Sequence, residues 1–295
     1  MDAKTTEQLH SQAHALDARP VGEAARLMVE AQVAAASVVS SALQTLCDAS
    51  EAMAQTIRNG GVLHYAAAGS SGLMAAADAL ELGGTFSIPS HQVCIHMAGG
   101  LPSGSEMPGD VEDDIESLQT AFPAGVSADT VIAVAASGST PYTLHAAKLG
   151  RERGATVIAI ANNRDAPLLA LADFPILLET PPEVLSGSTR LGAGTSQKIA
   201  LNTLSTLMGL RLGHIHDGMM VNVKADNAKL RGRAQSIVTQ IAGVAPSDAQ
   251  HALDNMDGDV KAAVLHAKGA TAADAKALLS ESGGHLRPAL ARLET

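Results

Sequence analysis

Short apolar runs alternate with longer stretches of helical periodicity through the middle of the chain. The short runs predict five strands, at Val62–Ala67, Gln92–Ala98, Thr130–Ala136, Thr156–Ala161 and Phe174–Leu178. The longer stretches predict helices over Ser71–Leu82, Val111–Ala121, Pro141–Arg153, Ala166–Ala172 and Ala193–Leu212. Strands that alternate with helices form βαβ units around a parallel sheet. We therefore expect an α/β fold with a doubly wound parallel sheet.

Helical patterns also flank this central region. Residues 20–58 predict two long helices, which end at Asn59-Gly60-Gly61 because glycine is a favoured helix stop. The tail predicts three short helices, at Ser247–Met256, Val260–Lys268 and Ala272–Glu281, with Ser247 and Thr271 as N-caps and with Gly269 and Gly283-Gly284 as stops. We expect one domain over residues 1–242, including the N-terminal helices, and a small helical domain over residues 243–295.

Composition narrows the class of protein. The 295 residues are 46% hydrophobic but only 2% aromatic, so Ala, Val, Ile and Leu must build the core, which suits helices packed closely on a parallel sheet. A formal charge of −10 argues against a nucleic-acid partner, because such binding needs a basic face. The first residues lack the pattern of a signal peptide, and no uncharged apolar stretch has the character of a membrane span. We expect a cytoplasmic protein with no membrane partner.

Two glycine- and serine-rich segments each join a predicted strand to a predicted helix. Gly69-Ser70-Ser71-Gly72 follows the first strand, and Ser137-Gly138-Ser139-Thr140 follows the third. Backbone N–H groups, hydroxyls and a helix N-terminus together suit a bound anion. Neither segment has the dinucleotide fingerprint or the P-loop ending. Two ordinary capped turns are the alternative, but a pair of them at one sheet edge favours a phosphate-bearing ligand.

Two glutamates are candidates for acid–base chemistry. Glu81 lies nearly three helical turns beyond Ser71, so it cannot face the first segment through that helix alone. It would need a kink near Gly83-Gly84 or a neighbouring subunit, and an exposed glutamate is the plain alternative. Glu112 belongs to an acidic run over residues 110–116, a pattern that is usually solvated. Carboxylates in distinct environments can divide acid and base roles, but this spacing does not establish a pair.

A third polar stretch, residues 181–198, leads into the last long helix of the central region. Its hydroxyls, glycines and two cations, with Ser188, Arg190 and Lys198 as candidates, suit anion binding at a helix N-terminus. A long, well-capped loop is the alternative. Cys47 and Cys94 form no CxxC motif, and His214-Ile215-His216, with Asp217 beside it, has no HExxH motif to supply the further ligands that a metal needs. We therefore expect no metal and no cofactor.

Taken together, these stretches resemble the N-acetylmuramic acid 6-phosphate etherases of the sugar-isomerase-domain superfamily. The resemblance covers nearly the whole chain and lies in the order and spacing of its motifs, which include Gly69-Ser70-Ser71-Gly72, Asp78 and Glu81, Glu112-Asp113, Ser137 to Tyr142, Glu183 with Gly187 to Arg190, Ala193 to Lys198, Asn202 and Gly283-Gly284. It implies a flavodoxin-like sheet and a typically homodimeric protein.

The resemblance also implies an activity. It is that of a lyase-type etherase that removes D-lactate from the C3 ether of a phosphorylated amino sugar. Glu81 then matches the acid that protonates the departing oxygen, and Glu112 matches the base that takes the C2 proton before water adds at C3. Ser70, Ser71, Ser137, Ser139 and Thr140 match the residues that hold the 6-phosphate.

This chain departs from the family pattern at positions that usually carry charge. Leu73 and Ser139 stand where the family usually has arginines, and Gly192 stands where it has a lysine. Gly83-Gly84 replaces a Pro-Pro pair, and Asn222 replaces an aspartate. A phosphosugar isomerase and a non-catalytic sugar-phosphate-binding regulator of the same superfamily therefore stay as alternatives.

Overall fold

The computed structural model describes residues 4–107, 109, 111–122 and 128–294. The chain divides into two compact units. One, called here the sheet unit, holds Met1–Leu80 and Ser90–Ser205; the other, the helical unit, holds Glu81–Pro89 and Thr206–Thr295. The expected domain of residues 243–295 lies within the helical unit, and its independence stays a prediction.

The sheet unit is built on five parallel strands, as predicted. They are β1 (Leu63–Ala67), β2 (Val93–Met97), β3 (Thr130–Ala135), β4 (Thr156–Ala161) and β5 (Phe174–Leu177), in the order β2-β1-β3-β4-β5. The chain winds outward from β1 to β2 and then returns to place β3 on the other side of β1. This reversal is the switch point at which open α/β sheets bind ligands. The doubly wound fold class is confirmed.

Small residues let one helical layer approach the sheet closely. Ala66, Ala133 and Ala159 occupy paired positions on β1, β3 and β4, and all three are buried. A Cβ atom on Gly150 of the covering helix would stand 2.6 Å from Cγ2 of Val131. Small side chains therefore lie at the interface between this helix and the strands, as expected from the aliphatic, aromatic-poor composition.

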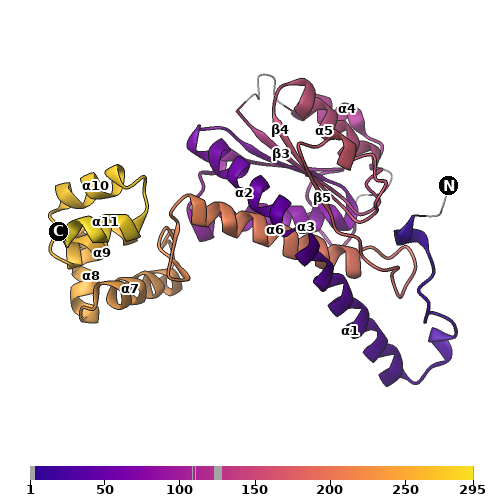
Figure 1. Cartoon of the computed structure of the whole chain (residues 1–295), viewed down its shortest axis with the longest axis horizontal. Helices are drawn as coiled ribbons and strands as arrows, with labels where there is room; N and C mark the ends of the chain where they lie inside the picture. Colours follow the sequence, from indigo (N-terminus) through magenta and orange to yellow (C-terminus); the bar gives the residue numbers. More distant parts are fainter. Residues whose placement is uncertain (1–3, 108, 110, 123–127, 295) are drawn as a thin grey trace. The chain divides into compact units, whose positions relative to one another are not determined.

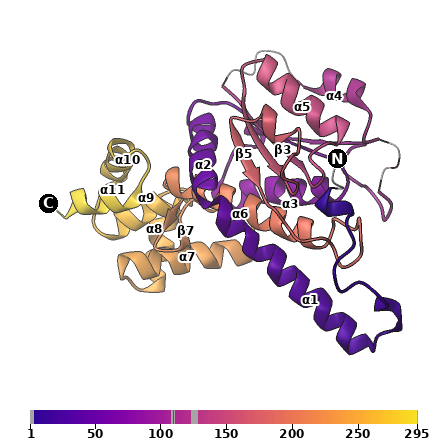
Figure 2. The ribbon, with the colours of Figure 1, turned by 45° about the vertical axis from the view of Figure 1, so that its right-hand side comes forward.

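Helices cover both faces of the sheet (Figures 1 and 2). Those of the sheet unit are α1 (Val21–Ser37), α2 (Leu43–Arg58), α3 (Gly69–Phe86), α4 (Ile115–Ala121), α5 (Pro141–Glu152) and α6 (Gly192–Arg211), the last residues of α3 and α6 belonging to the helical unit. α4 and α5 lie on one face, whereas α2, α3 and α6 lie on the other. The predicted pair of N-terminal helices is α1 and α2, joined by a 3-10 turn at Val38–Ala42.

Two helix predictions need correction. Residues 166–172 form only a 3-10 turn at Leu169–Leu171, because the N–H of Leu168 donates to the carbonyl of Gly138 (3.0 Å) and Ala166 packs against that glycine. α4 begins at Ile115 rather than at Val111. The Asp114 side chain accepts from the N–H of Ser117 (3.1 Å), and this N-cap sets the helix start.

α1 carries apolar side chains that are exposed in the described part of the chain. Val21, Val29 and Val33 are exposed along it, and Leu43 is exposed at the start of α2. The helical stretch Val21–Arg58 is long and apolar enough to cross a membrane by length and composition alone, a pattern that our sequence expectation did not include. The same pattern is typical of a helix covered by a second protein surface.

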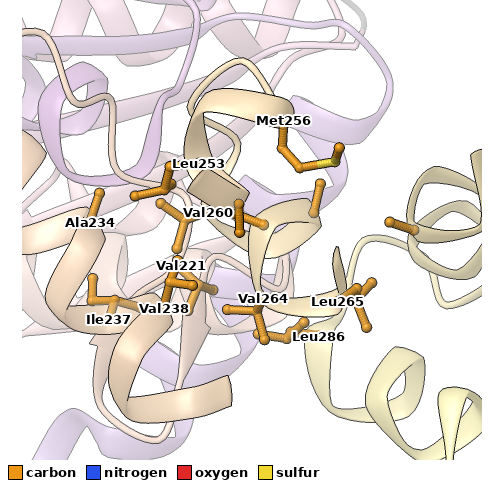
Figure 3. Close-up of a cluster of buried hydrophobic side chains, with 14 of the residues drawn as sticks. Val221, Ala234, Ile237, Val238, Leu253, Met256, Val260, Val264, Leu265 and Leu286 are labelled. Atoms are coloured by element: carbon orange, nitrogen blue, oxygen red, sulfur yellow. The ribbon is translucent and has the colours of Figure 1, made fainter. Parts of the chain in front are cut away.

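The helical unit has its own core (Figure 3). It contains a short hairpin of β6 (Ile215–His216) and β7 (Met219–Met220), then α7 (Ala228–Ala242), α8 (Pro246–Asn255), α9 (Val260–Ala267), α10 (Ala272–Glu281) and α11 (Leu286–Leu293). Three of these helices confirm the predicted tail, whereas α7, α11 and the hairpin were missed. Thr271 caps α10 as expected, but Ser247 caps nothing, because α8 begins at Pro246.

Candidate active site

The two glycine- and serine-rich segments begin side by side. β1 and β3 are neighbours in the sheet, and Ala67 at the end of β1 pairs with Val134 near the end of β3. Both segments therefore leave the carboxyl edge of the sheet at its switch point, where ligands of such sheets bind. The sequence analysis predicted that both segments lie at one edge of the sheet, and the register of β1 and β3 confirms it.

The first segment forms the first turn of α3 rather than a separate loop. Gly69 has a φ of +54°, a conformation that favours glycine, and the N–H of Gly72 donates to the carbonyl of Ala68 (2.9 Å) as the first bond of the helical ladder. The N–H groups of Gly69, Ser70 and Ser71 precede that bond. Amides in this position have no acceptor within their own helix, so they suit an anion.

The second segment is a tight turn into α5. Gly138 has a φ of +63°, and a Cβ atom there would stand 2.2 Å from Cβ of Ala166, so no larger residue fits. The N–H and the Oγ of Ser139 both lie 3.2 Å from Oγ of Ser137. Thr140 then precedes Pro141 at the helix start. Two serine hydroxyls thus gather at the N-terminus of α5.

Glu112 lies between these two segments. Its Oε1 is 3.2 Å from the position that a Cβ atom would take on Gly69, and its backbone carbonyl accepts from the N–H of Tyr142 (2.9 Å) in the first turn of α5. Its carboxylate is exposed. The structure therefore brings one of the two predicted glutamates to both predicted anion-binding segments. The acidic run of the sequence did not reveal this placement.

Glu81 has a different setting. It is exposed on the last part of α3, which belongs to the helical unit, and the helix continues through Gly83 and Gly84 to Phe86. Asn222 holds this helix end, donating from Nδ2 to the carbonyl of Phe86 (3.0 Å) and accepting at its own carbonyl from Oγ of Ser87 (2.5 Å). The catalytic role of Glu81 stays a prediction.

The N-terminus of α6 already holds a carboxylate from this chain. Glu183 is buried, and its two oxygens accept from the N–H groups of Gly192 and Ala193, each at 2.9 Å. A Cβ atom on Gly192 would stand 3.1 Å from both Oε2 of Glu183 and Cβ of Ala35. The anion that we expected at this helix end is thus an internal cap. Ser188 is half-buried and Arg190 and Lys198 are exposed nearby in the sequence; their binding roles stay predictions.

A buried carboxylate ties α3 to β1 and α6. Asp78 accepts from Tyr65 Oη (2.9 Å), Asn202 Nδ2 (2.7 Å) and Ser205 Oγ (2.8 Å). Burial raises the pKa of Asp78 from its usual value, while these hydrogen bonds and Lys198 oppose the rise. This network fixes the orientation of α3, whose first turn carries the serine residues.

One group in the described part of the chain could hold a metal ion. His64, Cys94 and His96 offer ligand atoms that lie within 4.8 Å of one another beneath Phe122. Both histidine rings are already engaged, since His64 Nδ1 lies 2.9 Å from His96 Nε2 and His64 Nε2 lies 3.0 Å from Asp129 Oδ2. Burial lowers the pKa of His64 and lowers that of His96 to about 4. We interpret the group as a neutral structural network.

The N-terminal segment reaches this edge of the sheet, which no sequence pattern indicated. Lys4 donates from Nζ to Oγ of Ser139 (2.5 Å), across a separation of 135 residues. Asn163, just after β4, exchanges hydrogen bonds with Thr6 and donates to the carbonyl of Ala136 (2.9 Å). Neither Lys4 nor Asn163 was a predicted site residue, because no local pattern marks such distant contacts.

The fold and the paired serine segments define the class of protein. A family model described as the SIS domain matches residues 28–162. The chain is also similar to a solved structure of an Escherichia coli CFT073 protein, with a TM-score of 0.50 and 13% identity over 67% of this chain and 94% of that one. The chain therefore has the sugar-isomerase fold.

Curated relatives then give the family. A Deinococcus radiodurans protein named N-acetylmuramic acid 6-phosphate etherase is 42% identical over 98% of this chain and 96% of its own length. Proteins of the same name from Streptomyces avermitilis and Mycolicibacterium smegmatis are 39% and 37% identical, over 99% and 98% of this chain and 94% and 98% of their own lengths. The chain belongs to the N-acetylmuramic acid 6-phosphate etherase family.

Proposed function

We propose that the protein cleaves the D-lactyl ether of N-acetylmuramic acid 6-phosphate. The observation that carries this proposal is the placement of Glu112, whose carboxylate lies beside Gly69 at the start of α3 and whose carbonyl binds the start of α5. A phosphate held by the two helix N-termini would leave the sugar ring within reach of this carboxylate. The membership of the chain in the etherase family supports the same substrate.

The proposed reaction is an elimination followed by a hydration. Glu112 takes the proton from C2, the bond between C3 and the ether oxygen breaks, and a double bond forms between C2 and C3. Glu81 gives a proton to the departing oxygen, so D-lactate leaves. Water then adds its hydroxyl to C3 and a proton to C2. Two glutamates that differ in protonation can perform both proton transfers in each half of the reaction.

We further propose a homodimer in which Glu81 acts at the site of the partner subunit. Glu81 is exposed, and α3 runs as one helix past Gly83 and Gly84 to Phe86, so we take the neighbouring subunit that the sequence analysis left open as the route. The exposed Val21, Val29 and Val33 of α1 support a self-complementary apolar surface. We propose the phosphorylated amino sugar as the one small-molecule partner. We also propose that the protein is cytoplasmic.

The activity is tested by incubating the protein with N-acetylmuramic acid 6-phosphate and assaying D-lactate. We expect release by the wild type and its loss in Glu112→Gln and Glu81→Gln. Exchange of the C2 proton in D₂O without lactate would instead indicate an isomerase-type reaction. Binding without either would indicate a regulator.

The shared site is tested by co-expressing the two inactive variants. If each site uses Glu112 of one subunit and Glu81 of the other, random mixing restores one complete site in each heterodimer, about a quarter of the wild-type sites. No recovery in a verified mixture of dimers would contradict the shared site while leaving the reaction itself intact.

A further inference from the structure

The second serine segment receives a cation from the N-terminal segment. Neither residues 69–72 nor residues 137–140 contain a lysine or an arginine. Lys4 nevertheless places its Nζ 2.5 Å from Oγ of Ser139, which in turn lies 3.2 Å from Oγ of Ser137. Lys4 and Ser137 also line one pocket of about 200 Å³. A positive charge therefore lies beside serine segments that themselves carry only neutral donors.

A set of specific contacts holds the residues that follow Lys4. Thr6 is only 2% exposed, and Asn163, which is 5% exposed, donates to its Oγ1 (3.2 Å). The carbonyl of Thr6 accepts from the N–H of Gly187 (3.2 Å), and Oγ of Ser186 donates to the carbonyl of Glu7 (3.1 Å). These bonds connect the segment to the end of β4 and to the stretch before α6. Buried polar groups therefore fix the part of the chain that places Lys4 here.

The other charges around the pocket leave Lys4 available for an anion. Arg164 also lines the pocket, but Glu179 binds its guanidinium through two bonds, at 2.6 Å and 3.1 Å. Asp165 is the one acid among the described lining residues and is exposed. Within the described part of the chain, the Lys4 ammonium donates to the neutral hydroxyl of Ser139. An incoming phosphate would replace this neutral hydroxyl acceptor with an anionic one, so that the ammonium would pair with an opposite charge.

We propose that Lys4 is a substrate-binding residue that contacts the phosphate of the sugar at the N-terminus of α5. The proposal rests on the proposed function for the identity of the substrate. Lys4 supplies the charge that Ser139 cannot supply, and its ammonium moves from Oγ of Ser139 to a phosphate oxygen when the ligand binds. Its contribution is to affinity and not to the proton transfers, so it raises binding of the ground state and of the transition state alike.

The test compares Lys4→Met with Lys148→Met, which removes an exposed lysine from the middle of α5. For N-acetylmuramic acid 6-phosphate, we expect Lys4→Met to raise KM about tenfold with kcat unchanged, as the loss of one charged hydrogen bond predicts. Lys4→Arg should stay close to the wild type. Lys148→Met should change neither constant. A KM for Lys4→Met equal to that of Lys148→Met would overturn the proposal.

Direct binding keeps this test separate from the activity. The probe is N-acetylglucosamine 6-phosphate, with unphosphorylated N-acetylglucosamine as its control, measured by calorimetry. We expect Lys4→Met to weaken the phosphorylated probe about tenfold and to leave the control unchanged. If the wild type binds the probe in a Lys4-dependent way but releases no lactate, the proposed function fails and the role of Lys4 stands. If lactate is released and the Lys4 variant binds normally, the opposite holds.

Two further variants examine how the charge is placed. Thr6→Val keeps Lys4 but removes the side-chain bond to Asn163, so it should weaken the phosphorylated probe in the same direction, with the melting temperature as a check on folding. Ser139→Arg in the Lys4→Met background returns a cation to the same end of α5. Recovery of affinity there supports a charge requirement at this spot, whereas no recovery together with a normal Lys4→Met variant overturns it.

Discussion

The N-termini of α5 and α6 look alike in sequence and differ in the folded chain. Each follows a segment rich in serine, threonine and glycine, and each was predicted to bind an anion. At α6 the buried Glu183 accepts from the N–H groups of Gly192 and Ala193, so the chain supplies its own anion. At α5 the hydroxyl of Ser139 accepts from the ammonium of Lys4 and lies 3.2 Å from the hydroxyl of Ser137. The first arrangement stabilises the fold, and the second suits an external phosphate.

The comparison teaches that a helix N-terminus predicts an anion but not its source. Both ends offer the same partial positive charge. What differs is whether a carboxylate from the chain can reach it, and that depends on a contact between residues 183 and 192, which the sequence pattern does not specify. The same reasoning separates Glu112, which lies beside an open helix end, from Glu183, which closes one.

The largest expected effect is that of changing Glu112, which lies beside the open N-terminus of α3. Glu112→Gln removes the proposed base without changing the size of the side chain, and loss of a general base costs about 10²–10⁴-fold in rate. Glu116→Gln, an exposed change on α4, is the matched control and should keep full activity. Lactate release under saturating substrate is the measurement. Equal rates for the two variants would remove Glu112 from the reaction.

The next largest effect is expected at the N-terminus of α6, which Glu183 caps. Glu183→Gln takes the charged acceptor from both N–H groups, of Gly192 and of Ala193, and turns an amide NH₂ donor toward one of them, so the free energy of unfolding should fall by about 1.5–3 kcal/mol. Glu179→Gln breaks only an exposed pair with Arg164 and should cost less than about 1 kcal/mol. Urea unfolding measures both. A Glu183 variant of normal stability but weakened phosphosugar binding would make the end of α6 part of the ligand site.

Acid should lower the free energy of unfolding of the sheet unit through a third residue, the buried His96. The pKa of His96 is about 4 in the folded chain against 6.5 for the free side chain, so the unfolded state takes up the proton first as the pH falls. The stability that His96 contributes is therefore full above pH 6.5 and is lost toward pH 4, at up to about 1.4 kcal/mol per pH unit. His96→Gln should flatten this slope, whereas the exposed His91→Gln should not. Identical slopes would contradict the burial effect.

The smallest effects are expected from removing single hydroxyl groups near the N-termini of α5 and α6. Ser139→Ala should raise KM about two- to tenfold, because a neutral hydrogen bond contributes about 0.5–1.5 kcal/mol. Ser188→Ala should raise it less, since Glu183 already fills the end of α6. Steady-state kinetics on both variants decide the matter. A larger effect at Ser188 would place the phosphate nearer α6 than α5.

Local patterns were sufficient for most of the fold. Strand length and hydrophobicity predicted all five strands to within a residue at each end. Strands of a parallel sheet are buried on both faces, so they are short continuous apolar runs such as Val131–Ala135. Two helix predictions failed, one at a distant contact and one at a local N-cap. The bond from Leu168 to Gly138 turned an expected helix into one turn, and the cap from Asp114 shortened another.

The same limit applies to the site. Glycine and serine beside strand ends were visible in the sequence, so both phosphate-binding segments could be proposed. The placement of Glu112 over Gly69, the cap from Glu183 and the arrival of Lys4 all join residues far apart in the chain or depend on side-chain direction. None has a periodic signal. Resemblance to the family suggested the two glutamates, and only the folded chain showed that Glu112 lies beside the first serine segment.

A crystal structure of Glu112→Gln with N-acetylmuramic acid 6-phosphate tests the central claim most directly. We predict the phosphate between the first turns of α3 and α5, in contact with Ser70, Ser71 and Ser139, with the sugar C2 facing residue 112. A phosphate at the N–H groups of Gly192 and Ala193, with the Glu183 side chain displaced, would contradict it.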